Sequence, residues 1–126
     1  MKKRIMVVDD DKLTLKLCEY ILTHKGYDAV TVESGKRCLE YLRAKNNPSV
    51  DCILLDIEMP LLNGFNTLSS IRQSEKLMEI PVMFLTATAT PDAVKEAIRL
   101  GVSSYLKKPF HPAELLEKVE QLLGGK

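Results

Sequence analysis

Short apolar segments alternate along this chain with longer segments in which apolar residues recur every three or four positions. Most of the short segments are apolar throughout rather than at alternate positions, which indicates strands covered on both faces, as in a parallel sheet. We therefore expect five strands, at Ile5–Val8, Tyr27–Val32, Cys52–Leu55, Pro81–Leu85 and Tyr105–Leu106.

The longer segments have the periodicity of helices and carry start or stop signals. Residues at helical spacing are Leu13, Leu17, Tyr20, Ile21 and His24 in the first segment, Leu39 and Leu42 in the second, Phe65, Leu68 and Ile71 in the third, and Val94, Ala97 and Ile98 in the fourth, and the last helix spans Pro112 to Leu123. The start signals are Ser34 and Thr90-Pro91, and the stop signals are Gly26, Asn46-Asn47-Pro48, Gly101 and Gly124-Gly125. We expect the apolar stripes, including Val94, Ala97 and Ile98, to face the core, and Met59-Pro60 with Asn63-Gly64 to form an irregular loop.

Five strand–helix units joined by short connections predict an α/β domain, with a parallel sheet that has helices on both faces. The 126 residues suit one domain, and no linker or low-complexity stretch divides residues 1–126. The function must then be inferred from the polar residues that such a sheet brings together.

Charge and cysteine content narrow the classes of function. The 18 basic and 17 acidic residues leave a net charge of +1, which gives no electrostatic reason to expect direct binding to nucleic acid or to a membrane. The N-terminal segment Met1–Arg4 is rich in basic residues and precedes an apolar run that ends at Val8. This run is too short for a signal peptide or a membrane span, so we expect a cytoplasmic protein. Cys18, Cys38 and Cys52 fit neither a disulfide framework nor a CxxC metal pair, and we expect three buried, reduced thiols.

Five charged or hydroxyl side chains lie at or just beyond the carboxyl ends of predicted strands: Asp9, Asp10, Asp56, Thr86 and Lys108. The carboxyl ends of parallel strands share one edge of the sheet, and ligand sites in such folds form there. Three converging carboxylates repel one another unless a cation lies among them. Because the carboxylates offer only oxygen ligands, we expect that cation to be Mg²⁺.

A carboxylate beside Mg²⁺ can attack phosphorus and form an acyl phosphate. Negative charge then spreads over the phosphoryl oxygens, and a lysine and a hydroxyl group can stabilise it. Lys108 and Thr86 are the residue types that suit these two roles. His24 and His111 lie outside this cleft, and we expect both on the surface.

Four motifs follow one another over nearly the whole chain. They are Val7-Val8-Asp9-Asp10, Leu55-Asp56-Ile57-Glu58-Met59-Pro60 with Gly64 after it, Leu85-Thr86-Ala87, and Lys107-Lys108-Pro109-Phe110. In this order the chain resembles the receiver domain of two-component response regulators, of the single-domain CheY-like kind. The resemblance implies a flavodoxin-like, doubly wound five-stranded parallel sheet of order 2-1-3-4-5 with five helices.

The resemblance also implies a role for each acidic residue. Asp56 would accept a phosphoryl group from a histidine kinase or a histidine phosphotransfer protein, and Asp10 would bind Mg²⁺ directly together with Asp56. Asp9 would hold the ion through water or orient the site. Glu58 would offer its backbone carbonyl to the ion, and its side chain would tune the lifetime of the phosphoryl group.

The remaining implied roles concern the switch. Thr86 and Lys108 would contact the phosphoryl oxygens, and the peptide between Lys108 and Pro109 would be cis. Tyr105 would match the aromatic residue that turns inward on activation, although ordinary half-buried packing of a strand residue is an equal alternative. Thr88 lies where the family tunes phosphoryl lifetime.

Three residues depart from the family pattern. Asp11 adds a third acid, which we interpret as the cap of the first helix. Asn63 stands where an aspartate is common before the glycine, a mild change in a turn. Lys107 places a second ammonium beside Lys108, so the assignment of Lys108 depends on the register of the last strand.

We therefore predict a phosphorylation switch that catalyses its own phosphorylation and dephosphorylation and is not a dedicated enzyme. The phosphoryl group would alter the face made by the helix at Pro91–Leu100, the fifth strand and the last helix, and so control an unidentified protein. One rival is a Mg²⁺-dependent phosphatase of the haloacid-dehalogenase kind, in which the nucleophile follows the first strand. Another is a flavodoxin-like binder of flavin mononucleotide, in which a Ser/Thr/Gly-rich loop stands where this chain has three aspartates. A receiver domain cut from a longer regulator is a third alternative.

Overall fold

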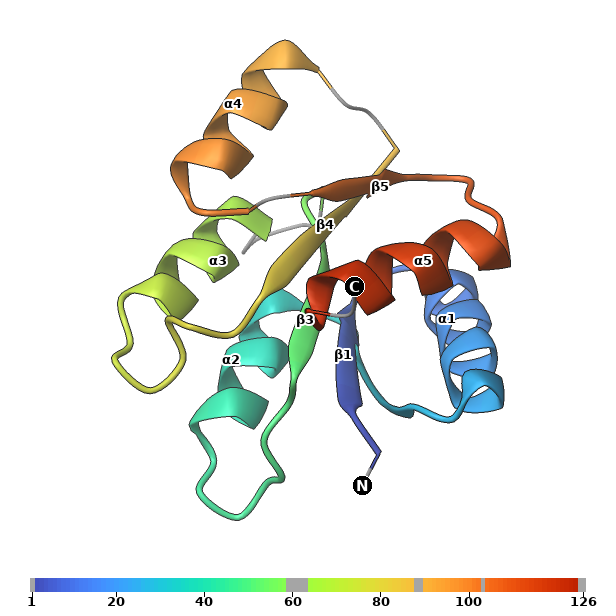
Figure 1. Cartoon of the computed structure of the whole chain (residues 1–126). Helices are drawn as coiled ribbons and strands as arrows, with labels where there is room; N and C mark the ends of the chain where they lie inside the picture. Colours follow the sequence, from blue (N-terminus) through green and yellow to red (C-terminus); the bar gives the residue numbers. More distant parts are fainter. Residues whose placement is uncertain (1, 59–63, 88–89, 103, 125–126) are drawn as a thin grey trace.

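The computed structural model describes residues 2–58, 64–87, 90–102 and 104–124, and it alternates strands and helices along the chain (Figure 1). The elements are β1 (Arg4–Val8), α1 (Lys12–Lys25), β2 (Asp28–Val32), α2 (Gly35–Arg43), β3 (Cys52–Asp56), α3 (Gly64–Arg72), β4 (Val82–Thr86), α4 (Pro91–Arg99), β5 (Tyr105–Lys107) and α5 (Pro112–Leu122). Every expected strand and helix is present.

All strand pairs are parallel, and the strand order is β2-β1-β3-β4-β5. This confirms the flavodoxin-like, doubly wound α/β fold. Neighbouring residues of a strand point to opposite faces of the sheet. In β1, Met6 and Val8 join the core beneath α2, α3 and α4, whereas Ile5 and Val7 join the core beneath α1 and α5. Each inner strand is therefore apolar at consecutive positions, as the sequence pattern indicated.

The expected helix caps are confirmed. The Asp11 carboxylate accepts the Leu13 N–H at 3.1 Å at the start of α1. Ser34 and Thr90 accept backbone N–H groups in the same way at the starts of α2 and α4. At the end of α1, Gly26 has a φ of 107°, the left-handed conformation that glycine adopts most readily.

The second helix is shorter than expected, since α2 ends at Arg43 and not near Asn46-Asn47-Pro48. The Ala44 N–H still bonds back to the carbonyls of Glu40 and Tyr41. The Asn47 side-chain amide also donates to the Tyr41 carbonyl, at 3.2 Å, so this carbonyl at the helix end accepts two hydrogen bonds.

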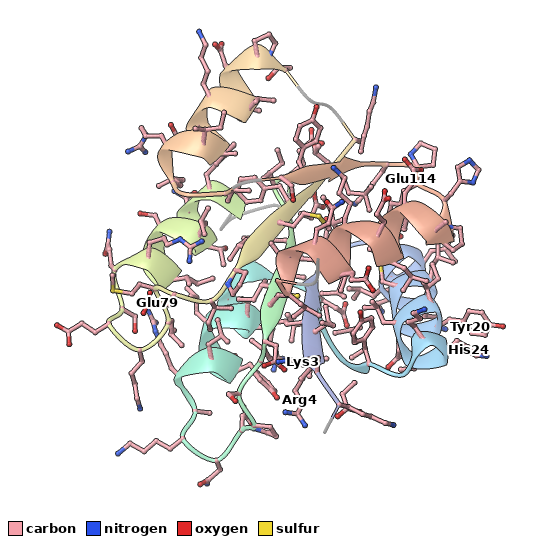
Figure 2. All side chains as sticks on the ribbon, in the orientation of Figure 1. Lys3, Arg4, Tyr20, His24, Glu79 and Glu114 are labelled. Atoms are coloured by element: carbon pink, nitrogen blue, oxygen red, sulfur yellow. The ribbon has the colours of Figure 1, made fainter. Side chains whose placement is uncertain are left out.

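The apolar stripe expected on the first helix is largely wrong. Leu13 is 75% exposed, and Leu17 and Tyr20 are also exposed, so of the expected apolar set only Ile21 faces the core. The buried residues of α1 are Leu15, Cys18, Ile21 and Leu22. Figure 2 shows Tyr20 and His24 on the outer side of α1, where their ring centroids lie 4.0 Å apart.

The fourth helix also differs from the expected stripe. Ala97 is its buried residue, Val94 is half-buried, and Ile98 is 66% exposed rather than inward. The rest of its apolar contact comes from half-buried residues such as Ala93 and Leu100, which pack against the core.

The three cysteines are buried and free, as expected. Burial raises the pKa of each of the Cys18, Cys38 and Cys52 thiols to about 12. The thiols are therefore neutral at physiological pH and pack as small apolar side chains.

None of the helices in the described ranges is long and apolar enough to cross a membrane. The longest, α1, has 14 residues, which is about 21 Å at the usual rise per residue and shorter than the ~30 Å hydrocarbon core of a bilayer.

Candidate functional site

The polar residues named from the sequence meet at the carboxyl edge of the sheet. Asp9 and Asp10 follow β1, and Asp56 ends the neighbouring strand β3. One carboxylate oxygen from each of these three residues lies within 4.8 Å of the others. Asp9 and Asp56 are buried and Asp10 is exposed, so the cluster opens to solvent on the Asp10 side.

Backbone N–H groups hold the two buried carboxylates in place. Asp9 Oδ1 accepts the Asp11 N–H at 2.9 Å, and Asp56 Oδ1 accepts the Glu58 N–H at 3.0 Å. Each carboxylate thus bonds to the chain two residues further on, a short loop that fixes its direction.

The Lys108 ammonium bridges the same two acids. Its Nζ donates a hydrogen bond to Asp9 Oδ2 and lies 3.6 Å from Asp56 Oδ2. The Lys108 N–H donates to the Thr86 carbonyl at 2.8 Å, and the Lys108–Pro109 peptide is cis. Lys107 is exposed, so the register of β5 turns Lys108, and not Lys107, toward the acids.

Burial and charge set the protonation of the site. Burial and, to a smaller extent, the neighbouring Asp9 raise the pKa of Asp56 to about 6, although the Glu58 N–H and the Lys108 charge oppose the shift. Burial alone would lower the pKa of Lys108, but its hydrogen bond to Asp9 and the charges of Asp9 and Asp56 outweigh burial and raise it. Asp56 is therefore largely ionised at neutral pH, and the cluster keeps an excess of negative charge that favours a cation.

Thr86 ends β4, the strand next to β3, and Tyr105 begins β5, where it pairs with Phe84. Thr86 is buried at the end of β4, whereas Tyr105 on β5 is 41% exposed. Both line a small cleft under α4, together with Ile57, Phe84, Ala93, Val94 and Ala97. The cleft connects the site edge to α4, and the inward turn of Tyr105 stays a prediction.

Some expected positions are not tested. Glu58 is exposed beside Asp56, with its N–H bonded to the Asp56 carboxylate, and the role of its carbonyl stays a prediction. Met59-Pro60 and Asn63, where a loop was expected, and Thr88 lie outside the described residues. His24 and His111 are exposed, as expected.

Gly64 matters more to the site than its sequence context indicated. It opens α3, and a Cβ placed there would lie 2.5 Å from Ile57 Cα and 2.6 Å from the Asp56 carbonyl oxygen. The Gly64 N–H also donates to the Ile57 carbonyl at 3.3 Å. A glycine that opens a helix despite its poor helix propensity was the one signal for this close approach.

The sequence profile of the response regulator receiver domain matches residues 5–120. The chain belongs to this family. Domains of this family are signalling switches of two-component systems rather than dedicated enzymes. The match supports neither the phosphatase nor the flavin-binding rival.

Relatives of this receiver domain resemble it over almost its full length. The response regulator SaeR of Staphylococcus aureus is 31% identical over 119 residues, which are 94% of this chain and 50% of SaeR. The chemotaxis protein CheY4 of Vibrio cholerae has 25% identity and a TM-score of 0.88, covering 97% of this chain and 99% of CheY4. The chain spans half the length, or less, of the curated relatives it matches first.

One solved structure bears on the acidic cluster. The receiver domain of the sensor histidine kinase PA1611 from Pseudomonas aeruginosa PAO1 is 28% identical and has a TM-score of 0.85, with 99% of this chain and 100% of that chain covered. That structure is described with a magnesium ion coordinated in its active site cleft.

Proposed function

We propose that this receiver domain accepts a phosphoryl group on Asp56, from the phosphohistidine of a histidine kinase or a histidine phosphotransfer protein, in a Mg²⁺-dependent reaction. The observation that carries the proposal is the convergence of Asp9, Asp10 and Asp56 within 4.8 Å, with the Lys108 ammonium beside two of them.

The residues of this cluster fit Mg²⁺. Three carboxylates and no soft ligand suit a hard ion, and the exposed side at Asp10 leaves room for water and phosphate oxygens. Asp9, Asp10 and Asp56 would hold the ion, with the Glu58 carbonyl as a further ligand. When bound, Mg²⁺ neutralises charge so that two anions, the carboxylate and the phosphoryl group, can approach. The magnesium described for the PA1611 receiver supports this choice.

The protein's own residues perform the transfer. One Asp56 carboxylate oxygen attacks phosphorus while the bond between phosphorus and the imidazole nitrogen breaks. That nitrogen keeps the electron pair and takes up a proton from solvent, so that histidine leaves as a neutral imidazole. Lys108 and Thr86 contact the phosphoryl oxygens and stabilise their charge. Attack of water on the acyl phosphate later releases inorganic phosphate and restores the Asp56 carboxylate.

The phosphoryl group then changes the face made by α4, β5 and α5, which binds a target protein. The acyl phosphate at Asp56 carries about −1.5 to −2 charges in place of the single charge of the carboxylate, and Thr86 moves toward the phosphoryl group. The space that Thr86 leaves accepts Tyr105, which lines the same cleft from an exposed position. The result is a shift between two existing states of this face. No direct contact with nucleic acid or a membrane is needed, and we infer a cytoplasmic location.

The proposal is tested by mass spectrometry of the intact protein after incubation with acetyl phosphate and Mg²⁺. The wild type gains one phosphoryl adduct, Asp56→Asn gains none, and a chelator abolishes the adduct in the wild type. As a matched control, Asp92→Asn replaces an exposed aspartate in the first turn of α4 and keeps the adduct. An adduct on both the wild type and Asp56→Asn, or on neither with several donors, overturns the assignment.

A further inference from the structure

Arg72 links three backbone segments that are distant in sequence. It is the last residue of α3, and its Nη1 donates to the carbonyls of Met78 at 2.8 Å and Ile80 at 2.9 Å. Its Nε donates to the carbonyl of Leu100 at 3.3 Å. One guanidinium therefore ties the end of α3, the loop that leads into β4, and the end of α4.

The contact to Leu100 lies at the point where α4 ends. Leu100 is the C-terminal cap of α4, and carbonyls there have no partner within the helix. A cation at this end also opposes the negative end of the helix dipole. Backbone bonds from Gly101 to Ile98 and from Val102 to Ala97 close the same turn, and Val102 is buried.

The other end of α4 has no comparable burial. Thr90, Pro91 and Asp92 are exposed, and Ala97, near the C-terminal end, is the buried residue of the helix. Figure 1 shows α4 at one edge of the molecule, above α3. The helix is thus held at the Leu100 end, while the cleft shared with Thr86 extends from Ala97 back to Ala93 and Val94.

We propose that Arg72 is a positioning residue that anchors the C-terminal end of α4 to the loop between α3 and β4. Its consequence for switching rests on the proposed function: the displacement that follows phosphorylation is confined to the first turns of α4, and the Leu100 end acts as a pivot. An aliphatic side chain cannot supply the three donors, and the single ammonium of a lysine cannot span them in the same plane.

Amide hydrogen exchange of the full chain, read by NMR or fragmentation mass spectrometry, tests the anchor without any phosphoryl donor. In Arg72→Met, the amides of Leu100, Gly101 and Val102 exchange at least about tenfold faster than in the wild type, because the local opening of this turn becomes easier. Arg72→Lys recovers only part of this protection. Arg43→Met, which changes the exposed last residue of α2, leaves these amides unchanged.

The amides of Ile53 and Leu54 in β3 report global unfolding in the same samples. A purely structural role for Arg72 raises exchange in β3 and at residues 100–102 by the same factor, and that result overturns the anchor, as does unchanged exchange at residues 100–102.

Acetyl phosphate with Mg²⁺ tests the pivot. Phosphorylation of the wild type changes amide hydrogen exchange mainly at residues 91–95, and in Arg72→Met this change extends to residue 102. A change that extends equally far in both proteins contradicts the pivot. Failure of the wild type to gain a phosphoryl adduct would contradict the proposed function alone, because the comparison without donor does not depend on it.

Discussion

The backbone at Gly64 lies so close to the backbone of Asp56 and Ile57 that no side chain fits at residue 64. A Cβ there would lie 2.5 Å from Ile57 Cα and 2.6 Å from the Asp56 carbonyl oxygen, and backbone atoms cannot turn aside as a flexible side chain can. We expect Gly64→Ala to lower the free energy of unfolding by about 1–3 kcal/mol, measured by urea denaturation. Because one of the displaced atoms is the carbonyl oxygen of Asp56, the rate of adduct formation with acetyl phosphate should fall as well.

Gly26→Ala is the matched control for this substitution. Gly26 has a φ of 107° and no atom within 4 Å of an added Cβ, so alanine there costs about 1–2 kcal/mol through backbone strain alone. Gly26 lies at the far end of α1 from the acids, and the adduct should form at the wild-type rate. Equal rates in the two variants would show that the contact at Gly64 does not position Asp56.

Some residues of the site could be predicted from the sequence, and others could not. The acids and Thr86 were predictable because each ends or follows an apolar run, and parallel strands bring such ends together. The choice between Lys107 and Lys108 was not predictable from the residues alone. Strand β5 has three residues, and a shift of its register by one residue would reverse which lysine turns inward. The tight contact at Gly64 depends on the path of a loop, which no periodicity encodes.

Among the helices, α1 has the clearest discrepancy between apolar pattern and burial. Leu13 is 75% exposed and Leu15 is 5% exposed, although they lie two positions apart in one helix. We expect Leu15→Ala to lower the free energy of unfolding by about 2–5 kcal/mol, through lost burial and a cavity. Leu13→Ala should change it by about 0.5 kcal/mol or less. Urea denaturation of both variants measures the difference, and equal costs would mean that the exposed face of α1 is covered in solution.

The helix phase was ambiguous because α1 is apolar on more than one side. Leu13, Leu17 and Tyr20 form one stripe at helical spacing, and Leu15, Cys18 and Leu22 form another. Only packing against β1 and β2 selects between them. In α4 the same limit applies to Ile98, since nine residues offer too few turns for periodicity to fix the buried side.

For the whole molecule, burial of one carboxyl group makes stability depend on pH. The pKa of Asp56 is about 6 in the folded chain against an ordinary value of 3.8. Between pH 4 and 6 the folded state holds more protons than the unfolded state, so the Asp56 contribution to the free energy of unfolding falls as pH rises through this range. In metal-free solution we expect Asp56→Asn to be more stable than the wild type at pH 7 by about 1–3 kcal/mol, and the two to converge near pH 4.

Thermal denaturation with a chelator, at several pH values, measures this difference, and Asp92→Asn serves as the exposed control. Addition of Mg²⁺ at pH 7 should raise the midpoint of the wild type more than that of Asp56→Asn, because a ligand stabilises the state that binds it. A constant gap between wild type and Asp56→Asn from pH 4 to 7 would contradict the raised pKa.

The overall architecture was the most predictable level. Continuous apolar strands separated by helices require a parallel sheet covered on both faces, and the observed cores beneath α1 with α5 and beneath α2, α3 and α4 have this form. The strand order came from the family resemblance, since alternation alone permits other orders.

The Lys108 ammonium sets the net charge of the acidic cluster. Three carboxylates and one lysine leave two negative charges at neutral pH, the amount that one divalent ion cancels. In the proposed site, Lys108 therefore brings the net charge of the cluster to the value that one Mg²⁺ ion would offset, as well as contacting the acids.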